Sequence, residues 1–467
     1  MNKNILKFLL VILVGVILWF VPVPNGLDVK AWHLASIFIA TVLGLILSPF
    51  PLGAMAIFSM TTVVALDLIP IKSALKGFGD TTIWMIACAF FISRGFIKTG
   101  FGRRVGYLFI SKLGNSSLGL SYGLVMTDLI FAPAMPSTSA RCGGIITPLF
   151  LSISNAYDST PEKGTQNKIG AFLVQCIFQC NAITCAMFLT SMAGNPMIAK
   201  FVENMGYTIS WTDWAKAAIV PGLLSLLVIP YVLYKFYPPE LKHTPEMKAI
   251  AKEKLKEMGK MTTKEWIVLG VFSYLVIFWV LGSFLKIDAT FTAFVGLCIL
   301  LLTHALEWND VISEKEAWHT IIWFAILMTL ASQLNTLGFI PWFGNYVAES
   351  VKGLPWLPML FILLLVYYYV HYLMASAIAH ISAMYVIFVS ISIAAGAPPM
   401  LAILLFAFFS NLNMSITHYS SGPAPILFGC GYIPLAKWWK IGFFMSLVIL
   451  AIWLLVGTAW WKAIGLF

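Results

Sequence analysis

The stretches Pro136-Ser137-Thr138-Ser139-Ala140-Arg141 and Ala375-Ser376-Ala377-Ile378-Ala379-His380 decide how this chain folds, and they lie 239 positions apart. Each has small and hydroxyl residues, and each has a cationic or protonatable residue four positions after its leading serine. Each lies between two apolar arms that are too short, or too interrupted, to be ordinary membrane spans. We therefore interpret them as the tips of two hairpins that enter a membrane and meet inside it.

The composition predicts a membrane protein with many spans. The 467 residues are 60% hydrophobic and only 10% charged, which is too apolar for a soluble protein of this length. The basic residues behind the net charge of +10 lie mainly in loops between spans, which favours membrane topology over a nucleic-acid partner. Most of the seven cysteines fall in apolar runs, where we expect packed thiols. We expect no metal site and no cofactor.

The apolar segments predict an all-α polytopic fold of eleven spans. Lys3 and Lys7 precede the first span, which places the N-terminus in the cytoplasm, and an odd number of spans puts the C-terminus outside. The N-terminal helix lacks a small-residue cleavage site, so we interpret it as a retained span and not a signal peptide. The expected spans are 5–22, 31–47, 52–69, 82–97, 169–192, 214–234, 266–284, 290–306, 320–337, 400–417 and 438–458.

Two hairpins, about 118–156 and 356–395, complete the membrane part. The fifth span is expected to break at Ala193-Gly194-Asn195-Pro196, and the tenth near residues 420–425, because proline cannot continue the helical hydrogen bonds.

The charged segment 235–264 predicts an amphipathic cytoplasmic helix on the membrane surface, which could bind anionic lipid; a solvated linker is the alternative. Residues 310–318 are expected to form a surface segment before the ninth span.

An internal repeat organises the chain. The 239-residue offset also relates Thr82-Ile83-Trp84 to Ile321-Ile322-Trp323, and Arg141 to His380. The predicted parts are an extra N-terminal helix (1–27), a first half (28–236), a basic linker (237–264) and a second half (265–467). Five spans separate equivalent positions, so the halves must be inverted in the membrane. Inverted repeats with broken helices at mid-membrane are typical of secondary transporters.

The interrupted helices favour an anion. Unpaired N–H groups and the helix dipole at each tip attract negative charge, and the tip hydroxyls add donors. Arg141 is costly at this depth unless it is paired, either with a ligand carboxylate or with Asp128. His380 and His418 could be functional or could be core histidines, whereas His371 is more consistent with a structural role. Two opposed clusters of donors suit a ligand with two carboxylates.

The motifs APAMPSTSARCGGIITP (132–148) and NLNMSITHYSSGPAPILFG (411–429) resemble the divalent anion/sodium symporter family over nearly the whole chain. The resemblance is strongest to its citrate/succinate antiporter and 2-oxoglutarate/malate translocator branch, which includes INDY-type exchangers. It implies a homodimer, an elevator movement, and di- or tricarboxylate anions as substrates. We expect a plasma-membrane location, with membrane lipid as a further partner. The expected substrate-binding residues are Ser137, Thr138, Ser139, Arg141, Gly194, Asn195, Ser376, Ala377, Ile378, His380, Thr417, Ser420, Ser421 and Gly422.

One departure from that family concerns sodium. Sodium-coupled members carry Ser-Asn-Thr at both tips, whereas residues 137–139 here are Ser-Thr-Ser and residues 376–378 are Ser-Ala-Ile. We hypothesise that Arg141, together with a protonated His380, replaces the charge of bound sodium. An empty carrier would then cross the membrane poorly, which predicts antiport of dicarboxylates such as succinate, malate, fumarate and 2-oxoglutarate, with citrate as a further candidate.

Three rival functions remain. A sodium-coupled symporter is the closest. An intramembrane hydrolase could use His371, His380, His418 and Asp128, but HExxH, GxSxG and paired intramembrane aspartates are missing from the sequence. A channel is disfavoured by the closed tips and by the lack of a charged or carbonyl-rich filter ring.

Overall fold

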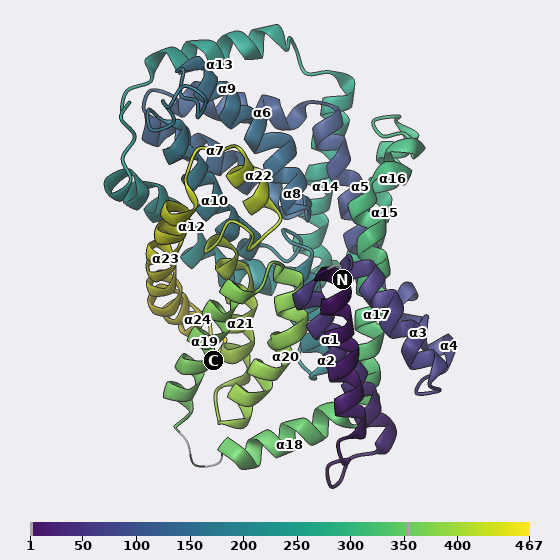
Figure 1. Ribbon diagram of the computed structural model, residues 1–467. Coiled ribbons are helices and arrows are strands. Elements are labelled where there is room, and N and C mark those ends of the chain that lie inside the picture. Colours follow the sequence, from purple (N-terminus) through teal and green to yellow (C-terminus); the bar gives the residue numbers. More distant parts are fainter. Residues whose placement is uncertain (1–2, 352, 354) are drawn as a thin grey trace.

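Helices make up the regular structure of this computed structural model, which describes residues 3–467 except 352 and 354 (Figure 1). Eleven helices among the described residues are long and apolar enough to cross a membrane. The expected all-α membrane fold is therefore confirmed. The first two residues of the expected N-terminal helix, and residues 352 and 354 of the expected second half, lie outside the described residues.

The helices follow the chain in this order. The first part contains α1 (Lys3–Phe20), α2 (Val29–Leu47), α3 (Leu52–Ala65), α4 (Ile71–Ala74), η1 (Lys76–Gly79), α5 (Thr81–Lys98), α6 (Phe101–Leu113), α7 (Ser117–Phe131), η2 (Ala132–Ala134), α8 (Thr138–Arg141), η3 (Cys142–Ile146), α9 (Thr147–Ala156), α10 (Gly170–Met187), α11 (Gly194–Asn204) and α12 (Trp211–Phe236). The second part contains α13 (Pro245–Glu257), α14 (Thr263–Leu285), α15 (Ala289–Leu302), α16 (Trp308–Ser313), α17 (Lys315–Thr336), α18 (Phe339–Val351), α19 (Trp356–Val370), η4 (His371–Leu373), α20 (Ala377–Ala394), α21 (Pro399–Leu412), η5 (Asn413–Ser415), α22 (Pro423–Gly429), α23 (Leu435–Ala451), η6 (Ile452–Gly457) and α24 (Thr458–Ala463).

The number of span-length helices agrees with the expectation, but its members differ. Three of the eleven are hairpin arms, at residues 117–134, 356–373 and 377–394. The expected spans 52–69, 290–306 and 400–417 fall instead on shorter apolar helices of the described chain. For example, α3 ends at Ala65, and Asp67 then takes a left-handed backbone conformation with φ 53°.

Two amphipathic helices cover the ends of the bundle: α13 lies across one end and α18 across the other (Figure 1). The segment 237–264 is not a free linker, because α13 packs on α6 and buries Met247 and Ala251. The Thr244 N–H also donates to the Asn115 carbonyl at 3.0 Å. Neither α6 nor α18 was expected from the sequence, since both are too short and too mixed in polarity to resemble spans.

The two hairpins share one local geometry. In each, the rising helix (α7 or α19) passes into a three-residue 3₁₀ turn, η2 or η4, and then an extended segment. A serine caps the next helix: Ser137 Oγ accepts from the Ala140 N–H at 3.1 Å, and Ser376 Oγ from the Ala379 N–H at 3.3 Å. Residues 117–134 and 356–373 correspond at the offset of 239 found in the sequence.

The helices pack in two groups, with the hairpin tips between them. In the first group, which we call the frame, α17 contacts α3, α5 and η1, while α15 packs on α5 and α2 on α3. In the second, the inner group, α10 contacts α7, α12 and α21, and α20 packs on α21. Every residue of α10 is buried, whereas α1 buries only Val11, so α10 is central and α1 peripheral.

A buried ion pair holds the α13 end of the molecule together. Arg104 Nε of α6 donates to Glu265 Oε1 of α14 at 2.6 Å, and Nη1 donates to the Gly259 carbonyl at 2.8 Å. The side chains are 8% and 2% exposed. Because the guanidinium contacts the segment between α13 and α14, this pair fixes the path of that segment along α6.

We predict that Arg104→Ala destabilises the protein by about 3 kcal/mol, because it leaves the Glu265 carboxylate buried without its partner. The thermal midpoint of the detergent-solubilised protein measures this. Lys254→Ala, which removes a solvent-exposed pair with Glu257, is the matched control and should leave the midpoint unchanged. Equal midpoints for Arg104→Ala and wild type would contradict the assignment.

Candidate functional site

A cavity of about 560 Å³ lies where the two hairpin tips meet the frame. The first tip contributes residues 136–139 and the second contributes residues 375–378. Two interrupted helices add Met192 and Ala193, and Met414, Tyr419, Ser421, Gly422 and Pro425. The frame adds Leu52, Phe90, Glu316, His319, Thr320 and Trp323. Eight of the fourteen expected site residues therefore line one cavity: six at the two tips, and Ser421 and Gly422 at the second break.

The tips present hydrogen-bond donors to this cavity. Among the described residues, the Thr138 and Ser139 hydroxyls have no hydrogen-bond acceptor, and neither does the Ser376 hydroxyl. The first N–H groups of the helices that begin at Thr138 and Ala377 have no partner within their own helix. Carboxylates are acceptors without a proton to donate, so this lining matches their chemistry.

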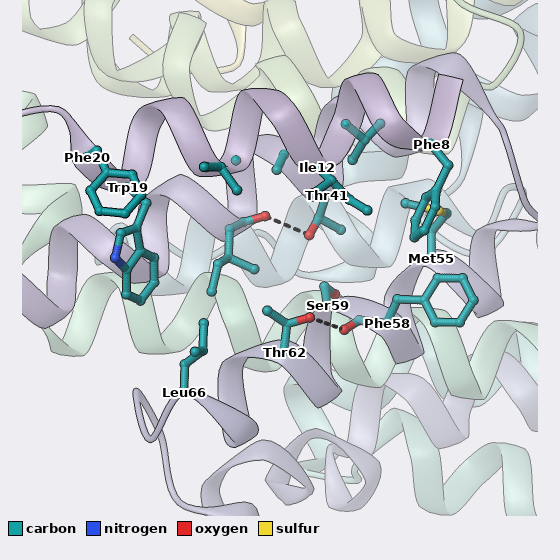
Figure 2. A pocket seen from close by; sticks show the side chains of 15 residues that line it. Phe8, Ile12, Trp19, Phe20, Thr41, Met55, Phe58, Ser59, Thr62 and Leu66 are labelled. Carbon is teal, nitrogen blue, oxygen red and sulfur yellow. Dashed lines mark hydrogen bonds between the residues drawn. The ribbon is translucent and has the colours of Figure 1, made fainter. Parts of the chain in front are cut away.

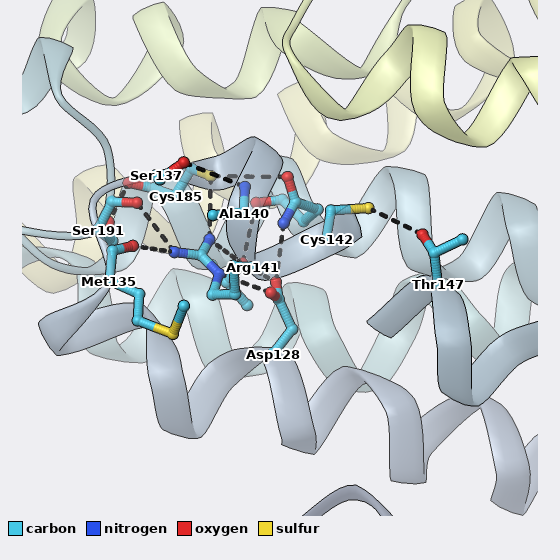
Figure 3. A network of polar contacts seen from close by, with 11 residues as sticks. Asp128, Met135, Ser137, Ala140, Arg141, Cys142, Thr147, Cys185 and Ser191 are labelled. Carbon is cyan, nitrogen blue, oxygen red and sulfur yellow. Dashed lines mark hydrogen bonds and ion pairs between the residues drawn. The ribbon is translucent and has the colours of Figure 1, made fainter. Parts of the chain in front are cut away.

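Arg141 does not line the cavity, which corrects the expectation that it faces a bound anion. Figure 3 shows its guanidinium within a network of polar contacts beside Asp128. Its side chain is fully buried, and Nε pairs with Asp128 Oδ1 at 2.6 Å. The remaining four N–H groups donate to the Met135 and Ser191 carbonyls, Thr184 Oγ1 and Cys185 Sγ. All five donors of the guanidinium are therefore used within the protein.

The Arg141 contacts join the first tip to the first helix break. Met135 belongs to the tip, and Ser191 belongs to the interruption between α10 and α11, so Nη1 bridges the two at 2.8 and 3.0 Å. Thr190 Oγ1 also donates to the Pro133 carbonyl. Asp128 accepts a second hydrogen bond from Asn181 Nδ2 at 3.1 Å. Of the two partners weighed for Arg141, the structure pairs it with Asp128.

Histidines join the second tip to the second break in the corresponding way. His371 Nε2 lies 2.8 Å from the Ser420 carbonyl, and His371 Nδ1 lies 3.1 Å from His380 Nδ1. Tyr419 Oη donates to the Tyr372 carbonyl at 2.6 Å. Because a carbonyl only accepts, His371 Nε2 carries the proton, and His380 Nδ1–H then donates to His371. Both rings are buried and neither lines the cavity. The expectation that His380 binds the substrate is therefore corrected.

The breaks differ from their expected positions. The first interruption covers residues 188–193, and Gly194-Asn195-Pro196 begin α11, because proline fits the first turn of a helix, where its missing N–H is not needed. Asn195 is buried and donates to the Cys185 carbonyl at 2.8 Å. Gly194, Asn195, Thr417 and Ser420 support the breaks without lining the cavity.

Sequence analysis missed Glu316 and His319, which lie on the cavity side of the frame. Helix α17 begins at Lys315, five residues before the expected start, so Glu316 fell in the segment taken as surface and His319 fell just before the expected span. Ser137 Oγ donates to Glu316 Oε2 at 2.5 Å, and His319 Nε2 accepts from the Gly53 N–H at 3.3 Å. Glu316 in the first turn is a favourable helix start, and this signal could have extended the helix backwards.

Ion pairs hold the start of α17 against the end of α5 within the frame. Lys98 Nζ at the end of α5 donates to Asp310 Oδ2 at 2.6 Å, and Arg94 Nε lies 4.0 Å from Glu314 Oε2. Burial alone would raise the pKa of Asp310, but the hydrogen bond from Lys98 lowers it below the usual value. These contacts place the first turn of α17 at a defined position opposite the first tip.

A second cavity, of about 500 Å³, lies among α1, α2 and α3 and suits no anion (Figure 2). Nearly all of its side chains are apolar. Its hydroxyls at Thr41, Ser59 and Thr62 donate to carbonyls of their own helices. Because its hydroxyls are used within their own helices and its described lining contains no cationic side chain, the cavity between the tips is the candidate site.

Comparisons with known proteins agree on the class. The model of the sodium:sulfate symporter transmembrane region matches residues 2–467. YflS of Bacillus subtilis (strain 168), whose name proposes malate transport, is 52% identical over 464 residues, covering 99% of this chain and 97% of that protein. Dicarboxylate transporter 1 of Arabidopsis chloroplasts (Arabidopsis thaliana) is 48% identical, covering 97% and 82%. The solved YdaH transporter of Alcanivorax borkumensis, 12% identical with a TM-score of 0.54 over 100% and 99% of the two chains, shares the fold.

We predict that Gly422→Ala damages the site. A Cβ there would overlap Ser139 Oγ and lie 3.6 Å from Thr138 Oγ1, so the Ser139 hydroxyl must leave its position in the cavity lining. A cost at the low end of overpacking, about 1.4 kcal/mol, corresponds to a loss in ligand affinity of about tenfold. Malate- and succinate-induced thermal stabilisation of the purified protein measures that affinity. Gly429→Ala at the other end of α22, where nothing lies within 4 Å, should behave like wild type. Unchanged stabilisation in Gly422→Ala would contradict the assigned site.

Proposed function

This chain belongs to the family of the sodium:sulfate symporter transmembrane region, so it is a transporter and not an enzyme, and we propose that it exchanges dicarboxylates across a membrane. The proposed substrates are of the succinate, malate, fumarate and 2-oxoglutarate class, with citrate as a further candidate. Relatives named for malate and dicarboxylate transport, at 52% and 48% identity, support this class.

The observation that carries the proposal is the shared cavity of the two tips. Its volume of about 560 Å³ is within the range of small-molecule sites, roughly 300–1,000 Å³. Hydroxyl and N–H donors reach it from two separate helix starts, Thr138 and Ala377. A ligand with a carboxylate at each end can accept hydrogen bonds from both tips at once, whereas a monocarboxylate satisfies only one.

Exchange without sodium is the finer part of the proposal. The Arg141 guanidinium donates to the carbonyls of Met135 and Ser191, where the first tip meets the first break. It carries the same sign of charge as a sodium ion would carry there. At the second tip, His371 donates to the Ser420 carbonyl. These three backbone oxygens, which a cation could otherwise coordinate, are therefore already hydrogen-bonded. This replaces the expected role for Arg141: paired with Asp128, it holds the first tip and the first break together behind the site and does not touch the ligand.

The alternative is a sodium-coupled symporter, which the description of the matching family model favours. It requires cation sites built from oxygens that are not already used. The two carriers differ in one measurable property: a symporter loads vesicles that contain no substrate, and an exchanger does not.

The wider arrangement is also part of the proposal. It consists of two inverted halves (28–236 and 265–467) joined by 237–264, with the N-terminus in the cytoplasm and the C-terminus outside a plasma membrane. The chain is proposed to be a homodimer in which the inner group moves against the frame. The shared backbone geometry of the two tips, at positions 239 residues apart, supports the repeat.

We predict robust counterflow in proteoliposomes. Labelled malate should enter vesicles loaded with unlabelled succinate or malate, and uptake into vesicles without internal dicarboxylate should stay near background. Replacing external sodium by potassium should change neither rate, because no sodium ion is carried. Sodium-driven uptake into empty vesicles would overturn the exchange mechanism in favour of the symporter.

We also predict separate effects of Arg141 on stability and on exchange. Arg141→Ala leaves Asp128 buried and unpaired, which costs about 3 kcal/mol and should lower the thermal midpoint. The double variant Asp128→Asn/Arg141→Gln removes both charges and should recover most of that stability while exchange stays impaired. Full exchange by the stable double variant would show that the pair has a structural role alone.

A further inference from the structure

One contact joins the first hairpin tip directly to the frame. Ser137 Oγ, at the start of α8, donates to Glu316 Oε2 in the first turn of α17 at 2.5 Å, and both residues line the cavity. The sequence separation is 179 residues, and α17 belongs to the frame whereas α8 is part of the tip. A carboxylate of the protein thus reaches into a cavity whose other tip residues suit a carboxylate ligand.

The Ser137 hydroxyl has one proton, and the contact with Glu316 uses it. Its oxygen already accepts from the Ala140 N–H at 3.1 Å, so the hydroxyl has no donor left for another acceptor. The corresponding Ser376 hydroxyl accepts from the Ala379 N–H but has no acceptor among the described residues. The two tips therefore share a backbone geometry, but only the Ser376 hydroxyl still has a proton to donate to a ligand.

The remaining polar neighbours of Glu316 do not replace Ser137. His319, one turn along α17, uses Nε2 to accept from the Gly53 N–H. Glu314, two residues before, carries the same charge: burial, and then the nearby Glu316 carboxylate, raise the pKa of Glu314. Ser137 is accordingly the one hydrogen-bond donor to Glu316 among the described residues.

We propose that Glu316 is a tethered substitute for the substrate carboxylate, which occupies Ser137 in the empty carrier and must be displaced when a dicarboxylate binds. This rests on the proposed exchange function. The hydrogen bond fastens the empty first tip to the frame helix α17. A bound carboxylate accepts the hydrogen bond from the Ser137 hydroxyl in place of Glu316. It then lies beside the Glu316 carboxylate, and repulsion between the like charges separates the tip from the frame.

The proposal gives exchange a local cause. Without substrate, any movement of the tip away from α17 must break the Ser137–Glu316 contact and gains nothing in return. With substrate, that contact is already broken, so the movement has no such cost. Since Glu316 is exposed to the cavity, a single hydrogen bond here alters the balance by about fivefold and not by orders of magnitude.

The test measures two rates in the same proteoliposomes: malate–malate counterflow, and net malate uptake without internal substrate. In Glu316→Ala we expect the ratio of net uptake to counterflow to rise about fivefold, and the malate concentration for half-maximal counterflow to fall by a similar factor. Glu316→Gln keeps an acceptor but loses the charge, so it should give a smaller rise. It also carries the test if the alanine variant folds poorly.

Glu257→Ala is the control, since it removes an exposed carboxylate of α13 that neither lines the cavity nor contacts α17, and its ratio should equal that of wild type. Wild type is measured first, because absence of counterflow there would refute the proposed function itself. Wild-type counterflow with unchanged ratios in both Glu316 variants would overturn the role of Glu316 alone. An equal rise in Glu257→Ala would overturn it too, since it would assign the effect to general charge.

Discussion

The satisfaction of backbone polar groups at interrupted helices constrains everything else in this molecule. Four helices stop inside the apolar bundle, at two hairpin tips and two breaks, and each stop leaves carbonyl and N–H groups without helical partners. The carbonyls are satisfied from within, by Arg141 at the first tip and break and by His371 and Tyr419 at the second. The N–H groups and hydroxyls of the tips face the cavity instead. This division, acceptors inward and donors toward the cavity, makes the site suited to anions.

Arg141 shows how a buried charge can serve a site without entering it. Its side chain is fully buried, yet Asp128 balances the charge and all five N–H groups are bonded. A pair like this contributes little net stability compared with apolar packing, but removing one partner is costly. Its distinctive property is geometric, because one planar guanidinium holds the tip and the break in register. A lysine with a single nitrogen could not reach these carbonyls and Asp128 with the same spread of donors.

Local rules explain how much could be predicted from the sequence. The hairpins, both tips, the presence of both breaks and the offset of 239 follow from proline, glycine and serine positions, which act through neighbouring residues, although the first break lies before its expected position. Side-chain destinations did not follow. Arg141 lies one turn after Ser137, but whether it points to the cavity or to Asp128 depends on how α7 and α10 pack. Glu316 contacts Ser137 although the two residues are 179 positions apart in the sequence, and no local pattern predicts such a contact.

The unequal chemistry of the two tips argues for a polarity in how a ligand lies. The first tip has three hydroxyls, whereas the second has Ser376 followed by Ala377 and Ile378. The helix starts supply N–H donors at both, so neither end rejects a carboxylate. The apolar side chains at the second tip desolvate what binds there, while the first tip offers more hydrogen bonds. A ligand with a hydroxyl beside one carboxylate gains from lying with that end at the first tip, and a symmetric dicarboxylate has no such preference.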